Sequence, residues 1–142
     1  MRTVVLYNSP RDDEAEVAAW RGYITAYDPA IDFRNWPETG PVEEIDYVLA
    51  WIHKPGDLAR YPNLKAIFWL GAGVDHLLKD KDLPRQVPIV RLVDDGLTAG
   101  MTEYVLLHAL RYHRRLPELE AQQSERLWRK LSYPLAKDRH IG

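Results

Sequence analysis

The 142 residues are 46% hydrophobic and carry a formal charge of −2, with acidic and basic side chains interspersed. A chain of this length buries about two-thirds of its unfolded surface and folds as one domain without crosslinks. The balanced charge argues against a surface for nucleic acid or anionic membranes, and no apolar run approaches the roughly 20 residues that span a bilayer. The absence of cysteine excludes disulfides and cysteine-ligated metals, and it favours a reducing, cytoplasmic location.

Five short segments are predicted to form β-strands, because they are rich in Val, Ile and aromatic residues and are bounded by turn-forming residues. They are residues 4–7, 32–33, 47–51, 66–70 and 89–92. A helix is predicted over residues 13–27, where Val17, Trp20 and Ile24 recur at helical spacing. Strands that alternate with helices and read as continuous apolar runs imply a parallel sheet covered on both faces. The predicted architecture is a doubly wound α/β fold of the flavodoxin-like type.

The pattern becomes helical after residue 92, and Pro117 is the one breaker in a long stretch. Asp94, Asp95 and Thr98 are candidate N-caps of a first helix that is apolar most of the way round, which indicates cover on more than one side. Pro117 is suited to the start of a second helix, which we expect to carry basic residues in its last turn and to stop at Pro134. The closing residues KDRHIG resemble the beginning of another strand, so we expect the chain to be cut there.

A glycine-rich turn, Gly71-Ala72-Gly73, follows the strand predicted at residues 66–70. The dinucleotide fingerprint G-x-G-x-x-G would need a third glycine where this sequence has His76, and no acidic residue ends a strand about 20 residues later. The glycines instead let consecutive backbone N–H groups converge on an anion at the carboxyl edge of the sheet. From the residues alone, a tight turn in which Asp75 caps the next helical turn stays open as the alternative.

Two motifs together resemble the D-isomer-specific 2-hydroxyacid dehydrogenases, and most closely their glyoxylate/hydroxypyruvate reductase branch. They are LKAIFWLGAGVDHLL at residues 64–78 and VPIVRLVDDGLTAGMTEYVLLHALRYHRRL at residues 87–116. In that family a strand leads into a G-A-G-V-D loop, and a further strand, a D-x-G turn and a long M-x-E-Y-V helix precede the Rossmann cofactor domain. The resemblance covers residues 45–142 well and the first 44 residues only in strand order.

This resemblance implies a division into a substrate-binding (lid) domain at residues 1–97, linking helices at 98–133 and the start of a missing cofactor domain at 134–142. The longer parent would reduce a small 2-oxo acid, glyoxylate or hydroxypyruvate, with NADPH or NADH. The catalytic arginine, glutamate and histidine of the family lie in or after the cofactor domain. We therefore expect no catalytic residue, no bound cofactor and no turnover in these 142 residues alone.

The resemblance also assigns binding residues. Ala72 and Gly73 match the loop whose backbone N–H groups bind the carboxylate of the substrate, and Gly71 leaves room beside them. Trp51 is similar to a tryptophan that walls the substrate pocket, with a core aromatic as the alternative. Met101 matches a position near the nicotinamide, with an ordinary helix-face core residue as the alternative.

The histidines are not expected to form a metal or catalytic site. His53 and His113 have no metal-ligand spacing with each other or with nearby carboxylates, so no metal is predicted. His76 adjoins the glycine turn but has no carboxylate partner at useful spacing. His108 lies on the apolar face of the predicted helix, which is typical of a core or interface histidine.

Two other functions of flavodoxin-like folds fail on particular residues. A receiver domain needs a phosphorylatable aspartate at the end of the third strand, where this sequence has Ala50-Trp51. A flavodoxin needs a hydroxyl- and glycine-rich loop after the first strand, where this sequence has NSPRDDEAE. The alternative that remains is a free-standing carboxylate-binding or dimerisation module. In either case the apolar linking helices predict a homodimer.

Overall fold

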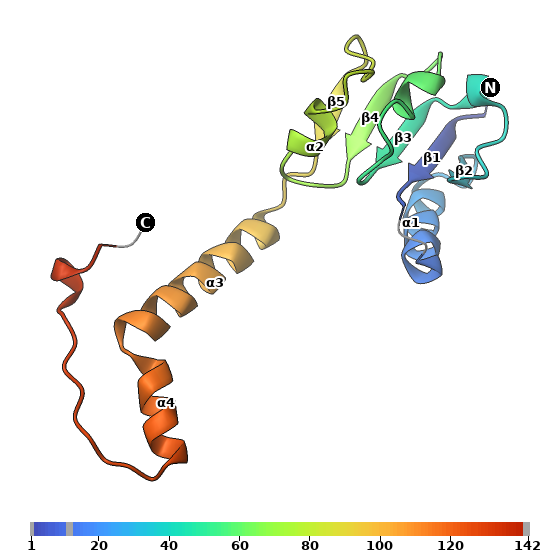
Figure 1. Cartoon of the computed structure of the whole chain (residues 1–142). Helices are drawn as coiled ribbons and strands as arrows, with labels where there is room; N and C mark the ends of the chain where they lie inside the picture. Colours follow the sequence, from blue (N-terminus) through green and yellow to red (C-terminus); the bar gives the residue numbers. More distant parts are fainter. Residues whose placement is uncertain (1, 11–12, 141–142) are drawn as a thin grey trace. The chain divides into compact units, whose positions relative to one another are not determined.

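The computed structural model describes residues 2–10 and 13–140 of the chain. The chain divides into two units, Met1–Val93 and Asp94–Gly142, and each is described by itself. The first unit holds a five-stranded sheet with its helices, and the second holds two helices and the segment that follows them (Figure 1).

The five predicted strands form one parallel sheet in the first unit. They are β1 (Val4–Asn8), β2 (Asp32–Asn35), β3 (Tyr47–Ala50), β4 (Ala66–Trp69) and β5 (Ile89–Arg91). Their order is β2-β1-β3-β4-β5, and every neighbouring pair is parallel. This is the strand order of flavodoxin-like sheets. The predicted fold class is confirmed, and each strand lies where the sequence places it, with ends that differ by one or two residues.

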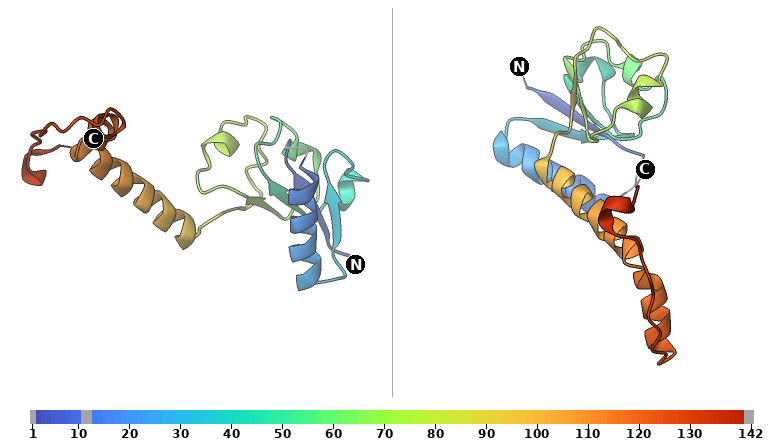
Figure 2. Two further views of the ribbon diagram at one scale, coloured as in Figure 1. Left: turned by 90° about the horizontal axis from the view of Figure 1, so that it is seen from below. Right: turned by 90° about the vertical axis from the view of Figure 1, so that its left-hand side faces the viewer.

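Alternate residues of β1 point to opposite faces of the sheet, as the period of a strand requires. Val5 and Tyr7 join one buried cluster, and Val4 and Leu6 join the other. Helix α1 (Glu14–Tyr27) covers the first of these faces (Figure 2). The three residues predicted from their helical spacing make its contact with that cluster: Val17, Trp20 and Ile24.

The opposite face is covered by loops and by the short helix α2 (Asp75–Leu78), whose Leu77 is fully buried. A buried hydrogen bond joins two of these segments, because His53 Nε2 lies 3.0 Å from Asp80 Oδ2 and the side chains are 3% and 2% exposed. Asp80 also accepts hydrogen bonds from the N–H groups of Gly56 and Asp82, each at 3.0 Å. Burial raises the pKa of the Asp80 carboxyl, but the hydrogen bonds from Gly56, His53 and Asp82 outweigh burial and leave that pKa below its usual value.

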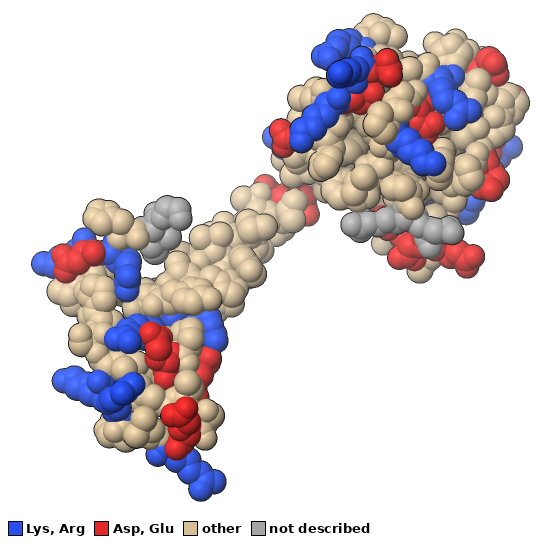
Figure 3. Space-filling model, viewed as in Figure 1, with Lys and Arg blue, Asp and Glu red and all other residues tan. Residues whose placement is uncertain are grey.

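The second unit begins with the predicted long helix, α3 (Asp95–His113). Asp94 is its N-cap, and its carboxylate accepts a hydrogen bond from Gly96 N–H at 2.9 Å. The residues exposed on α3 include many apolar side chains: Leu97, Met101, Tyr104, Val105, Leu106, Leu107, Leu110 and Tyr112. Much of the surface along α3 carries no charge (Figure 3). Among the described residues no helix is both long and apolar enough to cross a bilayer.

Helix α4 (Leu116–Ser124) is shorter than predicted. The buried Gln122 holds the segment that follows α4 through two hydrogen bonds. Its backbone carbonyl accepts from Leu127 N–H at 2.8 Å, and its side-chain oxygen accepts from Arg129 N–H at 3.1 Å. Arg126 adopts the left-handed conformation with φ of 54°, which turns the chain away from the helix axis. The basic residues expected in the last turn of the helix therefore lie beyond it.

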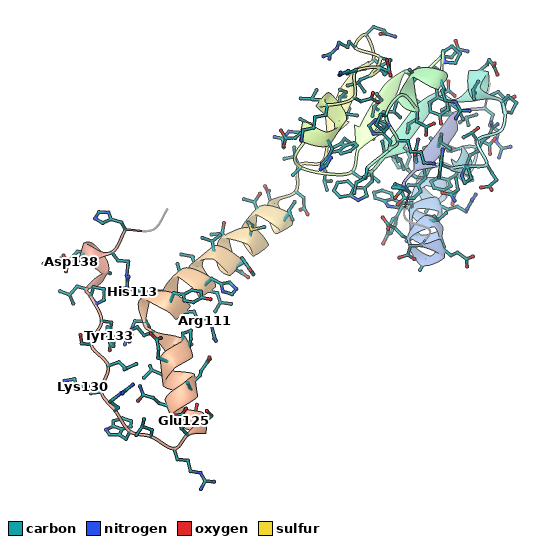
Figure 4. All side chains as sticks on the ribbon, viewed as in Figure 1. Arg111, His113, Glu125, Lys130, Tyr133 and Asp138 are labelled. Atoms are coloured by element: carbon teal, nitrogen blue, oxygen red, sulfur yellow. The ribbon has the colours of Figure 1, made fainter. Side chains whose placement is uncertain are left out.

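The segment after α4 returns along the two helices, as the labelled side chains of Lys130 and Tyr133 show (Figure 4). Arg114 fixes this return, because its guanidinium donates to the Tyr133 hydroxyl at 3.0 Å and lies 4.7 Å from the centre of its ring. A short 3-10 turn follows at Ala136–Asp138. The strand suggested by the closing residues falls partly on Ile141 and Gly142, which lie outside the described residues.

Candidate functional site

The candidate site lies at the carboxyl edge of the sheet, where Trp51 follows β3 and the glycine turn follows β4. Carboxyl ends of neighbouring parallel strands share one edge, and ligands bind at that edge in open α/β sheets. The two segments touch: a Cβ added to Gly71 would lie 2.4 Å from Trp51 Cζ3. The structure thus brings together Trp51, Gly71, Ala72 and Gly73. Met101, the fifth residue singled out, lies on α3 in the second unit and is 58% exposed.

All three carbonyl oxygens of the glycine turn accept hydrogen bonds from residues at the ends of β4 and β5. The pairs are Leu92 N–H to Gly71 O at 3.3 Å, Arg91 Nη1–H to Ala72 O at 3.2 Å, and Trp69 Nε1–H to Gly73 O at 2.7 Å. Each carbonyl oxygen of the turn therefore accepts a hydrogen bond from another part of the protein.

The N–H groups of the same turn are not used in this way. Among the hydrogen bonds of the described residues, none has the N–H of Ala72, Gly73 or Val74 as its donor. The C=O and N–H of a trans peptide point in opposite directions, so each held carbonyl turns the next N–H away from the group that holds it. Ala72 and Gly73 are exposed. We call these three donors the loop N–H groups; consecutive donors of this kind form anion-binding sites.

Only one part of the tight-turn alternative is wrong: Asp75 does not cap the next helical turn. Asp75 is the first residue inside α2, and no side chain makes a capping hydrogen bond to that helix. The turn is held instead through its carbonyl oxygens, by donors from β4 and β5.

Two indole rings pack against the glycine turn. Trp51 and Trp69 have ring centres 5.7 Å apart, and Trp69 is only 2% exposed. There is no space for a side chain at Gly71, because an added Cβ would meet both rings. At Gly73 the nearest atom to an added Cβ is Asp75 Oδ2, at 3.6 Å. The two glycines therefore differ: Gly71 permits close packing, and Gly73 keeps the exposed side of the turn open.

A small cavity of about 250 Å³ lies beside Trp69 and His76, which flank the turn in the sequence. It is lined by Ile52, His53, Pro55, Trp69, His76, Lys79 and Asp80. Ile52 has a left-handed backbone with φ of 49°, which is rare for a β-branched residue and is found preferentially where function imposes strain. His53 Nδ1 is buried and has no partner among the described residues. These two features had no signal in the sequence pattern.

Two other histidines singled out in the sequence, His76 and His108, have ordinary surroundings. His76 is exposed on α2, and the ring of His108 lies 4.4 Å from that of Tyr104 on α3. Within residues 2–10 and 13–140, no three His, Asp or Glu side chains are grouped so that they could hold a metal ion.

A parallel sheet of this order, with open backbone donors at its carboxyl edge, is typical of α/β domains that bind small ligands there. No protein-family model matches the sequence. Individual proteins do: the chain is 38% identical over 121 residues to glyoxylate/hydroxypyruvate reductase A of Yersinia enterocolitica, covering 82% of this chain and 38% of that protein. It is 36% identical over 132 residues to the enzyme of the same name from Photorhabdus laumondii, covering 89% and 42%.

Solved structures agree with these relatives. A D-isomer-specific 2-hydroxyacid dehydrogenase from Xanthobacter autotrophicus, in complex with NADPH and MES, superposes with a TM-score of 0.77 at 33% identity, over 97% of this chain and 44% of that one. The NADPH-dependent glyoxylate/hydroxypyruvate reductase of Sinorhizobium meliloti, in complex with NADP and sulfate, gives 0.75 at 34% identity, over 96% and 43%.

The chain is therefore similar to one part of the D-isomer-specific 2-hydroxyacid dehydrogenase family. Within it, the match is to the glyoxylate/hydroxypyruvate reductase branch, as the two sequence motifs predicted. The chain spans about 40% of the length of the curated relatives that it matches.

Proposed function

We propose that this chain is the substrate-binding part of a reductase that converts a small 2-oxo acid, glyoxylate or hydroxypyruvate, to the 2-hydroxy acid with NADPH or NADH. The observation that carries the proposal is the glycine turn, whose carbonyl oxygens are all held by the protein while the loop N–H groups are open. Fixed N–H donors bind a carboxylate through charge-assisted hydrogen bonds and so orient the molecule that carries it. The 2-oxo group of the substrate is then left free for reduction.

The other site residues take supporting roles in this proposal. Trp51, packed against Gly71, forms a wall of the substrate pocket, and Met101 packs near the nicotinamide. The cofactor supplies the hydride when it is bound; the relatives solved with NADP or NADPH favour that form. These residues contain no G-x-G-x-x-G motif, and the resemblance implies that the three catalytic residues of the family lie in or after the cofactor domain. The 142 residues alone therefore bind the acid without reducing it.

This function is tested by titrating the ¹⁵N-labelled chain with glyoxylate and, in parallel, with glycolaldehyde, which lacks the carboxylate. Glyoxylate should shift the backbone amide signals of Ala72, Gly73 and Val74 with a dissociation constant on the order of 1 mM, and glycolaldehyde should not. Mixing the chain with NADPH and glyoxylate should give no oxidation of the cofactor. Unchanged amide signals at the turn would contradict the binding role. Measurable NADPH oxidation would contradict the proposal that the 142 residues alone do not reduce the acid.

We further propose that the chain self-associates through α3. Apolar side chains are exposed along this helix, and surfaces of this kind are usually covered by a partner. Light scattering at increasing concentration should give a mass of at least a dimer. Leu107→Lys on α3 should shift the chain toward monomer, whereas Leu135→Lys, at an equally exposed position outside the helices, should not. A monomer mass at every concentration would rule out this assembly.

A further inference from the structure

Trp69 is both the last residue of β4 and a neighbour of the glycine turn that follows it. The residue is 2% exposed, and its ring contacts the ring of Trp51 and, nearly at right angles, the ring of His53, whose centre is 6.0 Å away. Tryptophan has one hydrogen-bond donor and no acceptor. That donor, Nε1–H, reaches the Gly73 carbonyl oxygen at 2.7 Å. The packing therefore fixes both the ring and the direction of its N–H.

This hydrogen bond sets the orientation of a peptide that faces the site. The bond between Gly73 and Val74 is trans, so the Val74 N–H points away from the indole when the Gly73 carbonyl points toward it. The preceding peptide is held by Arg91, but at 3.2 Å and from an exposed side chain. Hydrogen bonds in low-dielectric surroundings are stronger than those in water, so the buried indole is the firmer of the two side-chain anchors.

We propose that Trp69 is a positioning residue for the anion-binding turn: its buried indole N–H holds the Gly73 carbonyl, and through that peptide it directs the loop N–H groups toward the carboxylate of the ligand, with Val74 N–H as an additional donor. The inference rests on the proposed function of the turn. It assigns to Trp69 a role that its place in a strand, with its side chain in the core, does not suggest.

The proposal has a second consequence, because the two ends of one peptide polarise each other. An anion that accepts from Val74 N–H pushes electron density through the peptide onto the Gly73 carbonyl oxygen, which makes that oxygen a stronger acceptor for the Trp69 N–H. Ligand binding should therefore shift the Trp69 indole proton signal, although the indole itself does not touch the ligand.

The test compares Trp69→Phe, which keeps an aromatic ring but removes the donor, with Trp20→Phe as the matched control. Trp20 packs on the opposite face of the sheet, against the ring of Tyr7. Titration with glyoxylate should give a dissociation constant about fivefold weaker for Trp69→Phe, in line with the loss of one net hydrogen bond, and an unchanged constant for Trp20→Phe. In the unsubstituted chain the Trp69 indole proton should move during the same titration.

Equal affinity of a folded Trp69→Phe and the unsubstituted chain would overturn the proposal. If the unsubstituted chain binds no glyoxylate, the proposed function fails, and positioning is then decided without ligand by ¹⁵N relaxation. Residues 72–74 should be rigid in the unsubstituted chain and mobile in Trp69→Phe, and equal rigidity would overturn the positioning role. If Trp69→Phe does not fold, 3-benzothienylalanine at residue 69, which exchanges the N–H for sulfur in a ring of the same shape, is used in its place.

Discussion

Asp80→Ala is expected to lower the free energy of unfolding by about 3 to 5 kcal/mol, the cost of leaving several buried hydrogen-bond donors without their acceptor. The Asp80 carboxylate accepts from His53, Gly56 N–H and Asp82 N–H, and its side chain is 2% exposed. Alanine would leave these donors without an acceptor. Urea unfolding followed by circular dichroism measures the loss.

Asp82→Ala is the matched control, since it removes an exposed carboxylate two residues away but keeps the backbone N–H that Asp80 binds. It should change the stability by less than about 0.5 kcal/mol. If the two variants lose the same stability, the buried pair is not what holds these loops together.

The same carboxylate predicts how stability depends on pH. The folded-state pKa of Asp80 lies below its unfolded value, so the stabilisation is complete above the unfolded pKa of about 3.9 and disappears as the pH falls through the lower folded value. Asp80→Asn removes this titration. Its unfolding free energy should therefore fall less steeply than that of the unsubstituted chain as the solution is acidified below that pKa, and parallel curves would contradict the assignment.

The second large effect is expected at Gly71. A methyl group there would lie 2.4 Å from Trp51 Cζ3 and 3.0 Å from Trp69 Nε1, so at least one indole must move. Forced repacking of this kind costs about 1 to 3 kcal/mol. Because the displaced ring borders the glycine turn, Gly71→Ala should also weaken glyoxylate binding by more than about tenfold, a change of about 1.4 kcal/mol. Calorimetric unfolding and the amide titration measure the two effects separately.

Gly73→Ala serves as the comparison in the same turn. Its added methyl would meet only Asp75 Oδ2, at 3.6 Å, and its backbone is not left-handed. Stability should be nearly unchanged, and any loss of binding must then come from the methyl group on the exposed side of the turn. A Gly71→Ala chain as stable as Gly73→Ala would contradict the packing described for Trp51 and Trp69.

The sheet could be predicted because its signals are local. Each strand is an apolar run bounded by turn residues. Val17, Trp20 and Ile24 recur at helical spacing, so the helix that covers the sheet could also be predicted from residues close together in the sequence. The end of α4 could not be predicted in this way. Residues 125–133 have no helix breaker, but the buried Gln122 side chain and the left-handed Arg126 outweigh their helix propensity.

Some residues of the candidate site could likewise be predicted from local sequence, and others could not. The glycine turn has a recognisable motif, so Gly71, Ala72 and Gly73 could be singled out from the sequence. Trp69 reads as a core residue of a strand, and only the path of the turn shows that its N–H reaches Gly73. His53 and Asp80 are 27 residues apart, and nothing in either segment indicates the other.

The paired indoles under the glycine turn also have an optical consequence. Trp51 and Trp69, 5.7 Å apart and inclined at 39°, are close enough for their excited states to couple. Such a pair produces a two-signed circular dichroism band whose sign and size depend on the angle between the rings. The Trp51 ring packs on Gly71, and the Trp69 ring is hydrogen-bonded to Gly73. The protein therefore contains a chromophore that reports the conformation of its own candidate binding loop without any added label.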